Sequence, residues 1–394
     1  MTPYERRAGA RKRLKGKARL ALVPVVGALA AVAISACGGS SSASTSNNSS
    51  GSSVNWATVK SVQAGGGMAA LVKAAEKEGH LNVITLPDNW ANYGTQMKEF
   101  KAKYHISITD EIPSGSSAQE IQAIESDRGD SKAPDVVDVG LSYAVPNDDL
   151  WAPYKVATWN DIPAENKDSN GLWFSDYGGY MSFGCDLKVV KSCPTTWAQL
   201  KSPAFKHDVA LNGVPGQASA ATSAVQAAAL NNGGSFTNVQ PGLNFFKDLK
   251  SNGNFNATDC DAGNLIEAGQ CPVIVNWDFL NVAGAWGLPS TAKWKVVVPK
   301  GTPFAEYYVQ AISKTAPDPA AARLWEEFLY SVQGQNNFLK GHARPVEMTA
   351  MEKAGTLDKV AAAALPPIHQ TATFPTVAAD TKAGDDIAKG WPTL

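Results

Sequence analysis

The chain has 394 residues, of which 44% are hydrophobic, 9% aromatic and 18% charged. This length and apolar content suffice for two ordinary domains, each with its own core. The charged fraction lies below the roughly 25% usual in soluble proteins, which argues against a disordered or coiled-coil chain.

The 35 basic and 36 acidic side chains nearly balance in number but are unevenly distributed. Residues 1–36 hold eight of the bases and one acid, so the rest of the chain has 27 bases, 35 acids and a formal net charge of −8. Only three arginines lie in that part: Arg128, Arg323 and Arg344. An acidic, arginine-poor body excludes nucleic-acid binding and disfavours an anionic ligand, because arginine forks are the usual clamps for phosphate and sulfate.

The N-terminal segment has the pattern of a secretory signal. A basic stretch precedes the apolar run LALVPVVGALAAVAISA at 20–36, whose 17 residues are short for a membrane span. The sequence ISAC ending at Cys37 resembles the bacterial lipobox, in which the cysteine is acylated as the signal is cut. We expect 1–36 to be a signal peptide and 37–53 a lipidated cysteine plus a Ser-rich tether. An uncleaved anchor and an ordinarily cleaved signal are the alternatives.

Four further cysteines, an even number, suit a chain routed to an oxidising compartment. We expect the pairs nearest in sequence to form disulfides, Cys185 with Cys193 and Cys260 with Cys271. Zinc binding is disfavoured, because no CxxC spacing occurs and no histidine accompanies these cysteines.

Strand and helix patterns alternate through the first part of the body. In chain order they predict a helix at 68–78, a strand at 81–86, a helix at 93–104, a strand at 106–112, a helix from Ser117 to about Arg128, and a strand at 135–139. The residues Ser117 to Glu120 have the form of a capping box, so we expect this helix to open at Ser117. The β-α-β-α-β order implies a parallel sheet with right-handed crossovers, whose ligands bind at the carboxyl ends of the strands.

The second part has the same alternation. The patterns predict strands at 180–184, 209–211, 273–276, 296–299 and 309–313, helices at 197–200, 219–230, 242–250, 320–330 and 334–339, and helical pieces in the last fifty residues. No repeat of 20–50 residues is visible.

Three segments resemble a known family. The sequence LVKAAEKEGHLNVITLPDNWANYGTQMKEFKAKYHISI at 71–108 resembles the opening of extracellular solute-binding proteins of ABC importers, in the iron, polyamine and thiamine branch of the type II periplasmic-binding-protein fold. The segments TTWAQLKSPAFKHDVAL at 195–211 and SKTAPDPAAARLWEEFLYSVQGQNNFL at 313–339 resemble later segments of that branch, in matching order.

The resemblance implies an α/β fold of two lobes joined by hinge-crossing strands, with the ligand in the inter-lobe cleft. Lobe one comprises 54–157 and 299–394, and lobe two comprises 158–298. The lobes close on a small solute, and the closed form docks on an ABC permease. The resemblance thus implies a monomeric, extracytoplasmic receptor held at the membrane by the lipid on Cys37, without enzymatic activity, cofactor or metal.

Candidate ligand-binding residues follow the expected strands. Asn89 and Trp90 come after the first strand, and Ser142 and Tyr143 come after the third, where polyamine-binding relatives place contacts. Asn89 can instead cap the next helix, together with Asp88, and Trp90 can cover the edge of the core.

Lobe two supplies three more candidates. Asn212 follows the strand at 209–211, and Trp277 and Asp278 follow the strand at 273–276, where relatives often have an aromatic wall. Helix capping is the structural alternative for Asp278.

A tyrosine doublet, Tyr307-Tyr308, precedes the strand at 309–313. Ferric-binding relatives chelate iron through paired tyrosines, but this doublet aligns with an aromatic site of the polyamine binders. Adjacent residues of a regular strand point to opposite faces, so at most one of them enters the cleft. We expect Tyr308 to do so, and iron binding is the alternative within the same fold.

The ligand class follows from what the chain lacks. Gln310 stands where polyamine binders have an acid two residues after the aromatic, and Asn212 to Gln217 replace acids expected in lobe two. A linear diamine needs a carboxylate at each end. The sequence therefore favours an organic cation, polyamine-like or held by aromatic faces and one carboxylate, or another small polar molecule.

A secreted hydrolase is the rival of another class. The sequence has no GxSxG, HExxH or P-loop motif, and its five histidines are scattered. An adhesive or structural lipoprotein is a third class, and it would show no ligand-dependent closure.

Overall fold

A computed structural model describes residues 54–257, 260, 263–282 and 284–394. The predicted signal peptide, Cys37 and tether lie outside the described residues. Within the described part, no helix combines the length and the hydrophobicity that a membrane crossing requires.

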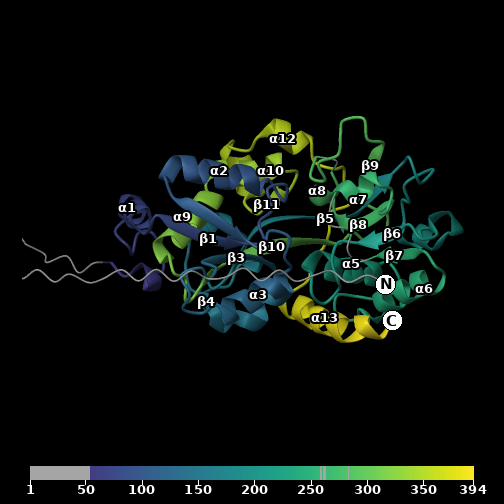
Figure 1. The fold of residues 1–394 in the computed structure, drawn as a ribbon, viewed down its shortest axis with the longest axis horizontal. Helices are drawn as coiled ribbons and strands as arrows, with labels where there is room; N and C mark the ends of the chain where they lie inside the picture. The colour runs from purple at the N-terminus through teal and green to yellow at the C-terminus, as the bar shows by residue number, and fades with distance from the viewer. Residues whose placement is uncertain (1–53, 258–259, 261–262, 283) are drawn as a thin grey trace, which may run out of the picture. The chain divides into compact units, whose positions relative to one another are not determined.

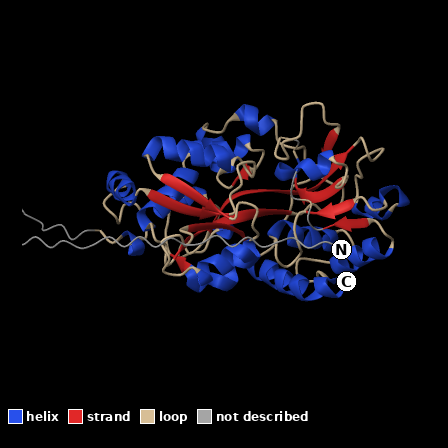
Figure 2. Cartoon of the chain, in the orientation of Figure 1, coloured by secondary structure: helices blue, strands red, loops and turns tan. Residues whose placement is uncertain are grey.

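The strands are β1 (His80–Ile84), β2 (Ser107–Glu111), β3 (Val136–Gly140), β4 (Trp151–Ala152), β5 (Phe174–Asp186), β6 (Val209–Leu211), β7 (Phe255–Ala257), β8 (Val273–Trp277), β9 (Trp294–Val297), β10 (Ala305–Ser313) and β11 (Arg344–Pro345). Helices cover both faces of the sheets (Figure 2).

The α-helices are α1 (Met68–Glu78), α2 (Tyr93–Tyr104), α3 (Ser117–Ser126), α4 (Leu141–Ala144), α5 (Ser219–Leu230), α6 (Gln240–Ser251), α7 (Gly263–Glu267), α8 (Asp278–Asn281), α9 (Pro319–Leu329), α10 (Val332–Lys340), α11 (Met348–Ala354), α12 (Lys359–Ala363) and α13 (Val377–Gly390). Short 3-10 helices are η1 (Trp56–Thr58), η2 (Val145–Leu150), η3 (Trp159–Asp161), η4 (Ala164–Asn166), η5 (Trp197–Lys201), η6 (Pro203–Phe205) and η7 (Trp391–Thr393).

Strand β5 connects two lobes, which we define by their strands: lobe one is built on β1 to β4 and lobe two on β6 to β9 (Figure 1). The first half of β5 pairs with β10, which in turn pairs with β3, and the second half pairs with β8 and β9. All 13 residues of β5 are buried. The expected two-lobe α/β fold with crossing strands is therefore present, and the crossing strands are β5 and β10.

The expected three-stranded parallel sheet in lobe one is only partly correct. Strands β1 and β2 are parallel, but β3 pairs antiparallel with β10. Its contact with β1 is made by Asp135, whose N–H donates to Asn82 O at 2.8 Å and whose Oδ2 accepts from Asn82 N at 2.7 Å. The difference arises because β10 reaches β3 from about 170 residues later in the chain, which local patterns do not reveal.

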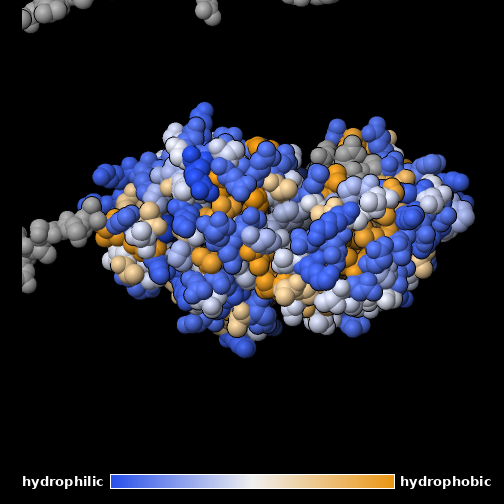
Figure 3. All heavy atoms as spheres, turned by 90° about the horizontal axis from the view of Figure 1, so that it is seen from below, coloured by the Kyte–Doolittle hydropathy of each residue, from blue (hydrophilic) through white to orange (hydrophobic). Residues whose placement is uncertain are grey.

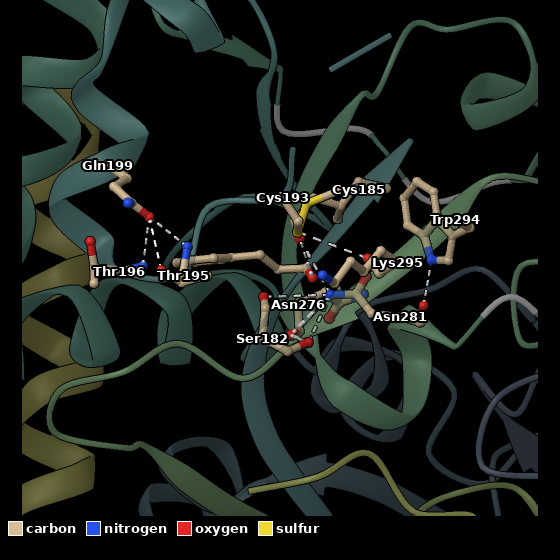
Figure 4. The surroundings of a disulfide bond; sticks show 12 residues. Ser182, Cys185, Cys193, Thr195, Thr196, Gln199, Asn276, Asn281, Trp294 and Lys295 are labelled. Carbon is tan, nitrogen blue, oxygen red and sulfur yellow. Dashed lines mark hydrogen bonds between the residues drawn. A yellow bond between two sulfur atoms is a disulfide. The ribbon is translucent and has the colours of Figure 1, made fainter. Parts of the chain in front are cut away.

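Lobe two contains both expected disulfides. Cys185, near the end of β5, is bonded to Cys193 (Figure 4), and Cys260 is bonded to Cys271, just before β8. The sequence separations are 8 and 11 residues. Both bridges restrict the unfolded chain close to strands that shape lobe two.

The C-terminal helix α13 contacts both lobes, although the resemblance assigned 299–394 to lobe one. Gly384 lies against Ser142 of α4, whereas Trp391 packs on Phe246 of α6 with ring centroids 5.5 Å apart. The face of the molecule seen from the side of α13 is mostly hydrophilic, with smaller hydrophobic groups between (Figure 3).

A buried carboxyl pair attaches α13 to the crossing strand β10. Glu306 of β10 and Asp380 of α13 lie next to each other, and Glu306 Oε1 and Asp380 Oδ2 have no hydrogen-bond donor among the described residues. Ser223 Oγ of α5 donates to Glu306 at 2.7 Å, and Gln226 Nε2 of α5 donates to Asp380 at 2.7 Å. Burial raises the pKa of both carboxyls. One proton shared between them satisfies the pair, because two buried carboxylates in contact repel each other.

We predict that Glu306→Gln reduces the loss of stability at alkaline pH. The raised pKa of Glu306 means that its contribution is complete below about 4.3, the ordinary pKa of glutamate, and is lost as pH rises through the folded-state pKa. Glutamine keeps the bond from Ser223 and donates an N–H to Asp380 without a titrating proton. Urea unfolding between about pH 5 and about pH 9 should show a shallower fall than in the unmodified protein, by up to about 1.4 kcal/mol per pH unit.

The exposed Glu352→Gln is the control and should leave the pH profile unchanged. Other buried carboxyls with raised pKa values also titrate, among them Asp135 at about 8 and Asp176 at about 7, so the test is the difference between variants. Parallel profiles for Glu306→Gln and the unmodified protein would contradict the shared proton.

Candidate functional site

A cavity of about 360 Å³ lies between the two lobes. This volume falls in the range of small-molecule sites. Lobe one contributes the ends of β1 and β2, the start of α3, and β3; lobe two contributes the loop after β6, the start of α5, and the segment after β8. The residues that line it are Thr85, Pro87, Asn89, Trp90, Pro113, Ser114, Gly115, Ser116, Ser117, Gln119, Glu120, Asp138, Asn212, Gly213, Val214, Gln217, Ala218, Ser219, Ala220, Leu280, Ala285, Trp286 and Tyr308.

The two lobes touch each other around this cavity. Asn89 Nδ2 donates to Ala285 O, and Ala118 N–H donates to Gln217 O at 3.3 Å. Gly140, at the end of β3, lies so close to α5 that a Cβ on it would come within 2.1 Å of Ser219 Oγ. The described arrangement is therefore a closed one, in which a bound molecule contacts both lobes.

Two buried carboxyl groups, Asp138 and Glu120, line the lobe-one side. Asp138 Oδ2 accepts hydrogen bonds from Tyr177 at 2.7 Å and from Tyr93 at 2.9 Å, whereas its Oδ1 has no partner among the described residues. Glu120 Oε2 accepts from the Asp138 N–H at 3.2 Å. Burial raises the pKa of both groups. The charge of Asp138 raises the pKa of Glu120 further, and the charge of Asp176 raises that of Asp138.

Helix α3 begins at Ser117 as expected, but its capping box lies one residue before the expected position, and this difference frees Glu120. The capping box is formed by Ser116 and Gln119, not by Ser117 and Glu120. Ser116 has the extended backbone of an N-cap, with φ of −125° and ψ of 160°. Glu120 then lies on the buried face of the helix and points its carboxyl group to β3.

Two aromatic side chains face each other in the lining. Trp90 and Tyr308 pack edge to face with centroids 5.8 Å apart. Trp90 Nε1 donates to Tyr177 OH at 2.6 Å, and Trp277 Nε1 donates to Tyr308 OH at 3.2 Å. Because Tyr177 in turn donates to Asp138, Trp90 and the carboxyl group belong to one hydrogen-bonded unit.

Lobe two presents the first turn of α5 to the cavity through Ala218, Ser219 and Ala220. The N-cap is Ala218, and no side chain caps the helix. The first N–H groups of an α-helix have no acceptor within the helix, and the helix dipole makes this end positive. This part of the wall therefore favours an oxygen acceptor.

Backbone strain occurs where lobe one meets the cavity. Thr85, after β1, and Ile112, after β2, have φ values of 57° and 49°. Positive φ is a genuine outlier for β-branched residues, and such strain is concentrated at ligand sites because the surrounding structure must hold it.

The structure brings four of the eight predicted ligand-binding residues to the cavity. Asn89, Trp90, Asn212 and Tyr308 line it. The other four, Ser142, Tyr143, Trp277 and Asp278, are not among the lining residues and make other contacts.

These other contacts are structural. Tyr143 is hydrogen-bonded to Thr222 of α5. Trp277 lies behind Tyr308, stacked on Phe279 and Phe304. Asp278 forms a buried ion pair with Arg344 at 2.6 Å and accepts from the N–H of Tyr180 at 2.9 Å.

The tyrosine doublet points to two sides of β10. Tyr308 lines the cavity, whereas Tyr307 stacks on Phe374 with centroids 5.4 Å apart. Among the residues that the structure describes, no group of three or more His, Cys, Asp or Glu is arranged to hold a metal.

Asp138 and Glu120 are site residues that the sequence analysis missed. Asp138 lies inside the strand pattern DVVDV, and an acid within an otherwise buried strand is a signal in itself, because a buried charge needs a partner. Glu120 was assigned to a helix cap, a one-residue error that concealed its position.

Comparison with known proteins agrees with this architecture. A family model described as "Bacterial extracellular solute-binding protein" matches residues 135–381. No curated protein matches the sequence.

Three solved structures illustrate the likeness in fold. The periplasmic binding protein AfuA from Actinobacillus pleuropneumoniae, with fructose-6-phosphate bound, is 17% identical over 80% of this chain and 97% of its own, with a TM-score of 0.63. The binding protein AgtB from A. tumefacien R10, in complex with agropinic acid, is 16% identical over 80% and 98%, with 0.62. Iron-bound HitA from Pseudomonas aeruginosa is 17% identical over 79% and 98%, with 0.58.

We predict that Gly140→Ala prevents the closed arrangement. The added methyl group would overlap Ser219, whose Cβ and Oγ lie 2.6 and 2.1 Å from its position. Gly140 has φ of −65°, so alanine causes no backbone strain there. Small-angle scattering of the variant should give a larger radius of gyration than that of the unmodified protein.

The compensating variant Gly140→Ala with Ser219→Gly removes the overlapping atoms and should restore the smaller radius. Ser219→Gly alone controls for the lost hydroxyl. An unchanged radius in Gly140→Ala would show that the lobes do not rely on this contact.

Proposed function

The chain belongs to the family of bacterial extracellular solute-binding proteins, and from this premise we propose that it is the receptor of an ABC importer. It captures a small solute between its lobes and delivers it to the permease. Binding and release are its whole activity, without chemical conversion of the solute.

The observation that carries this proposal is the cavity enclosed by both lobes, which share the crossing strands β5 and β10. A solute that contacts both walls binds the closed arrangement better than an open one, and this difference in affinity shifts the equilibrium. A permease can then distinguish the loaded receptor by its shape.

The lining favours an organic cation or another small polar molecule. Within the described lining there is no Lys, Arg or His, whereas Asp138 and Glu120 are acidic and Trp90 and Tyr308 are aromatic. Ferric iron is a weaker candidate, because Tyr307 lies away from the cavity. The similar structures contain a sugar phosphate, agropinic acid and iron, so the shared fold does not choose the ligand.

The location is part of the proposal. A lipid on Cys37 and the tether at 37–53 hold a monomeric receptor at the outer side of the membrane. This arrangement keeps the receptor near its permease. Lobe boundaries at 157/158 and 298/299 remain part of the same proposal, with α13 spanning both lobes.

We predict that a solute panel of organic cations, amino acids, sugars and oxyanions contains a stabilising ligand. At a concentration about 100 times its Kd, such a ligand adds about 2.7 kcal/mol to the free energy of unfolding, which thermal shift detects. The solute should be recovered unchanged after incubation with the protein. Small-angle scattering with that ligand should show a conformation at least as compact as that of the free protein.

Turnover of a solute would instead indicate a hydrolase. Stabilisation by phosphate or sulfate alone would contradict the cation preference but not the receptor. No ligand and no change in conformation across the panel would contradict the receptor itself.

A further inference from the structure

We propose that the solute is a zwitterion, whose protonated amine is bound by Asp138 of lobe one and whose carboxylate is bound by the first turn of α5 in lobe two. This inference rests on the proposed function and specifies its ligand. It is based on two chemically opposite walls of one cavity.

The amine site is the carboxyl group of Asp138, a residue that lines the cavity. The side chain is 5% exposed, and its Oδ1 has no hydrogen-bond partner among the described residues. Its other oxygen already accepts from two tyrosines, so the carboxyl group is fixed in position. An unpaired buried acceptor lowers stability, and an N–H of a bound ammonium group would satisfy it.

Among the described residues that line the cavity there is no Lys, Arg or His to pair with this acid. Arg344 is bonded to Asp278, and Arg323 donates to the backbone oxygens of Val59, Pro319 and Ala57. Neither arginine is among the lining residues. The missing counterion of Asp138 is therefore expected to come from the solute.

The carboxylate site is the start of α5. This helix has 12 residues and no side-chain cap, and its first turn lines the same cavity as Asp138. Free N–H groups and the positive end of the dipole favour an anionic oxygen. The hydroxyl of Ser219 is at the same place and is hydrogen-bonded to Tyr308.

The position of the two sites on different lobes explains why both charges are needed. A solute with only an amine is held by lobe one, and a solute with only a carboxylate is held by lobe two. A zwitterion bridges the two lobes, so its binding energy favours the closed arrangement directly. The aromatic pair Trp90 and Tyr308 is available to the part of the solute between its charges.

The test is isothermal titration of the purified full chain with the ω-amino acids from glycine to 6-aminohexanoate. For each length, the n-alkylamine, the n-alkanoate and the α,ω-diamine are titrated in parallel. We expect at least one ω-amino acid to bind tenfold or more tightly than its three counterparts, which corresponds to about 1.4 kcal/mol. N-trimethylation of that compound removes the N–H donors and should weaken binding by at least tenfold.

Variants assign the two sites. Asp138→Asn keeps the shape and should weaken binding of the ω-amino acid at least tenfold, whereas Asp186→Asn, at a buried acid outside the lining, should not. Ala218→Asp caps α5 and places a negative charge at the carboxylate site. It should raise the melting temperature, because Asp is a better N-cap than Ala. It should also weaken binding of the same ω-amino acid at least tenfold.

Ala218→Asn is the matched uncharged cap and should weaken binding less than Ala218→Asp. Because Ala218→Asp is expected to stabilise the fold, loss of binding cannot be assigned to unfolding. Equal affinity for the matched amine, binding of the alkanoate alone, or preference for the diamine would overturn the zwitterion. Any of these results leaves the receptor function standing, whereas a failure of every solute class in the broader panel contradicts that function.

Discussion

The shared strand β5 is the constraint on which the rest of the structure depends. Its 13 residues are all buried, and they pair with the crossing strand β10 at one end and with the lobe-two strands β8 and β9 at the other. Backbone hydrogen bonds connect β5 and β10 to strands of both lobes, so the lobes can bend about these two strands but cannot slide along them. Opening and closing are therefore the movements that this topology permits, and the cavity lies where they act.

The electrostatics of the cavity complement that geometry. Desolvation raises the pKa of Asp138 and Glu120, and the neighbouring acids Asp176 and Asp138 raise these two values further, in that order. A cluster of this kind costs free energy in the empty protein. A cationic group that enters the cavity recovers part of that cost, and it does so only where the lobes enclose it and exclude water.

Local elements could be predicted from the sequence, and long-range ones could not. The helices at 68–78, 93–104 and 219–230 are confirmed to the residue, because periodicity and end signals determine them. The pattern at 180–184 showed only part of β5, since its first half is buried by strands distant in sequence. Likewise, Trp277 lies at the end of a strand, yet its ring packs in the core behind Tyr308. The position of a residue along a strand does not show how deeply its side chain is buried.

The C-terminal helix adds a restraint that the family resemblance did not reveal. Helix α13 is bonded to lobe two through Gln226 and Asp380, lies against lobe one at Ser142, and is joined to the crossing strand by Glu306. Opening the lobes must therefore either carry α13 with one of them or break contacts along its length. Asp380 accepts from Gln226 of α5 and from the backbone of Ser142 in α4, and its carboxyl neighbour Glu306 belongs to β10. This one buried side chain thus joins α13 to both lobes and to the strand between them, so the packing of α13 is part of the closing contact itself.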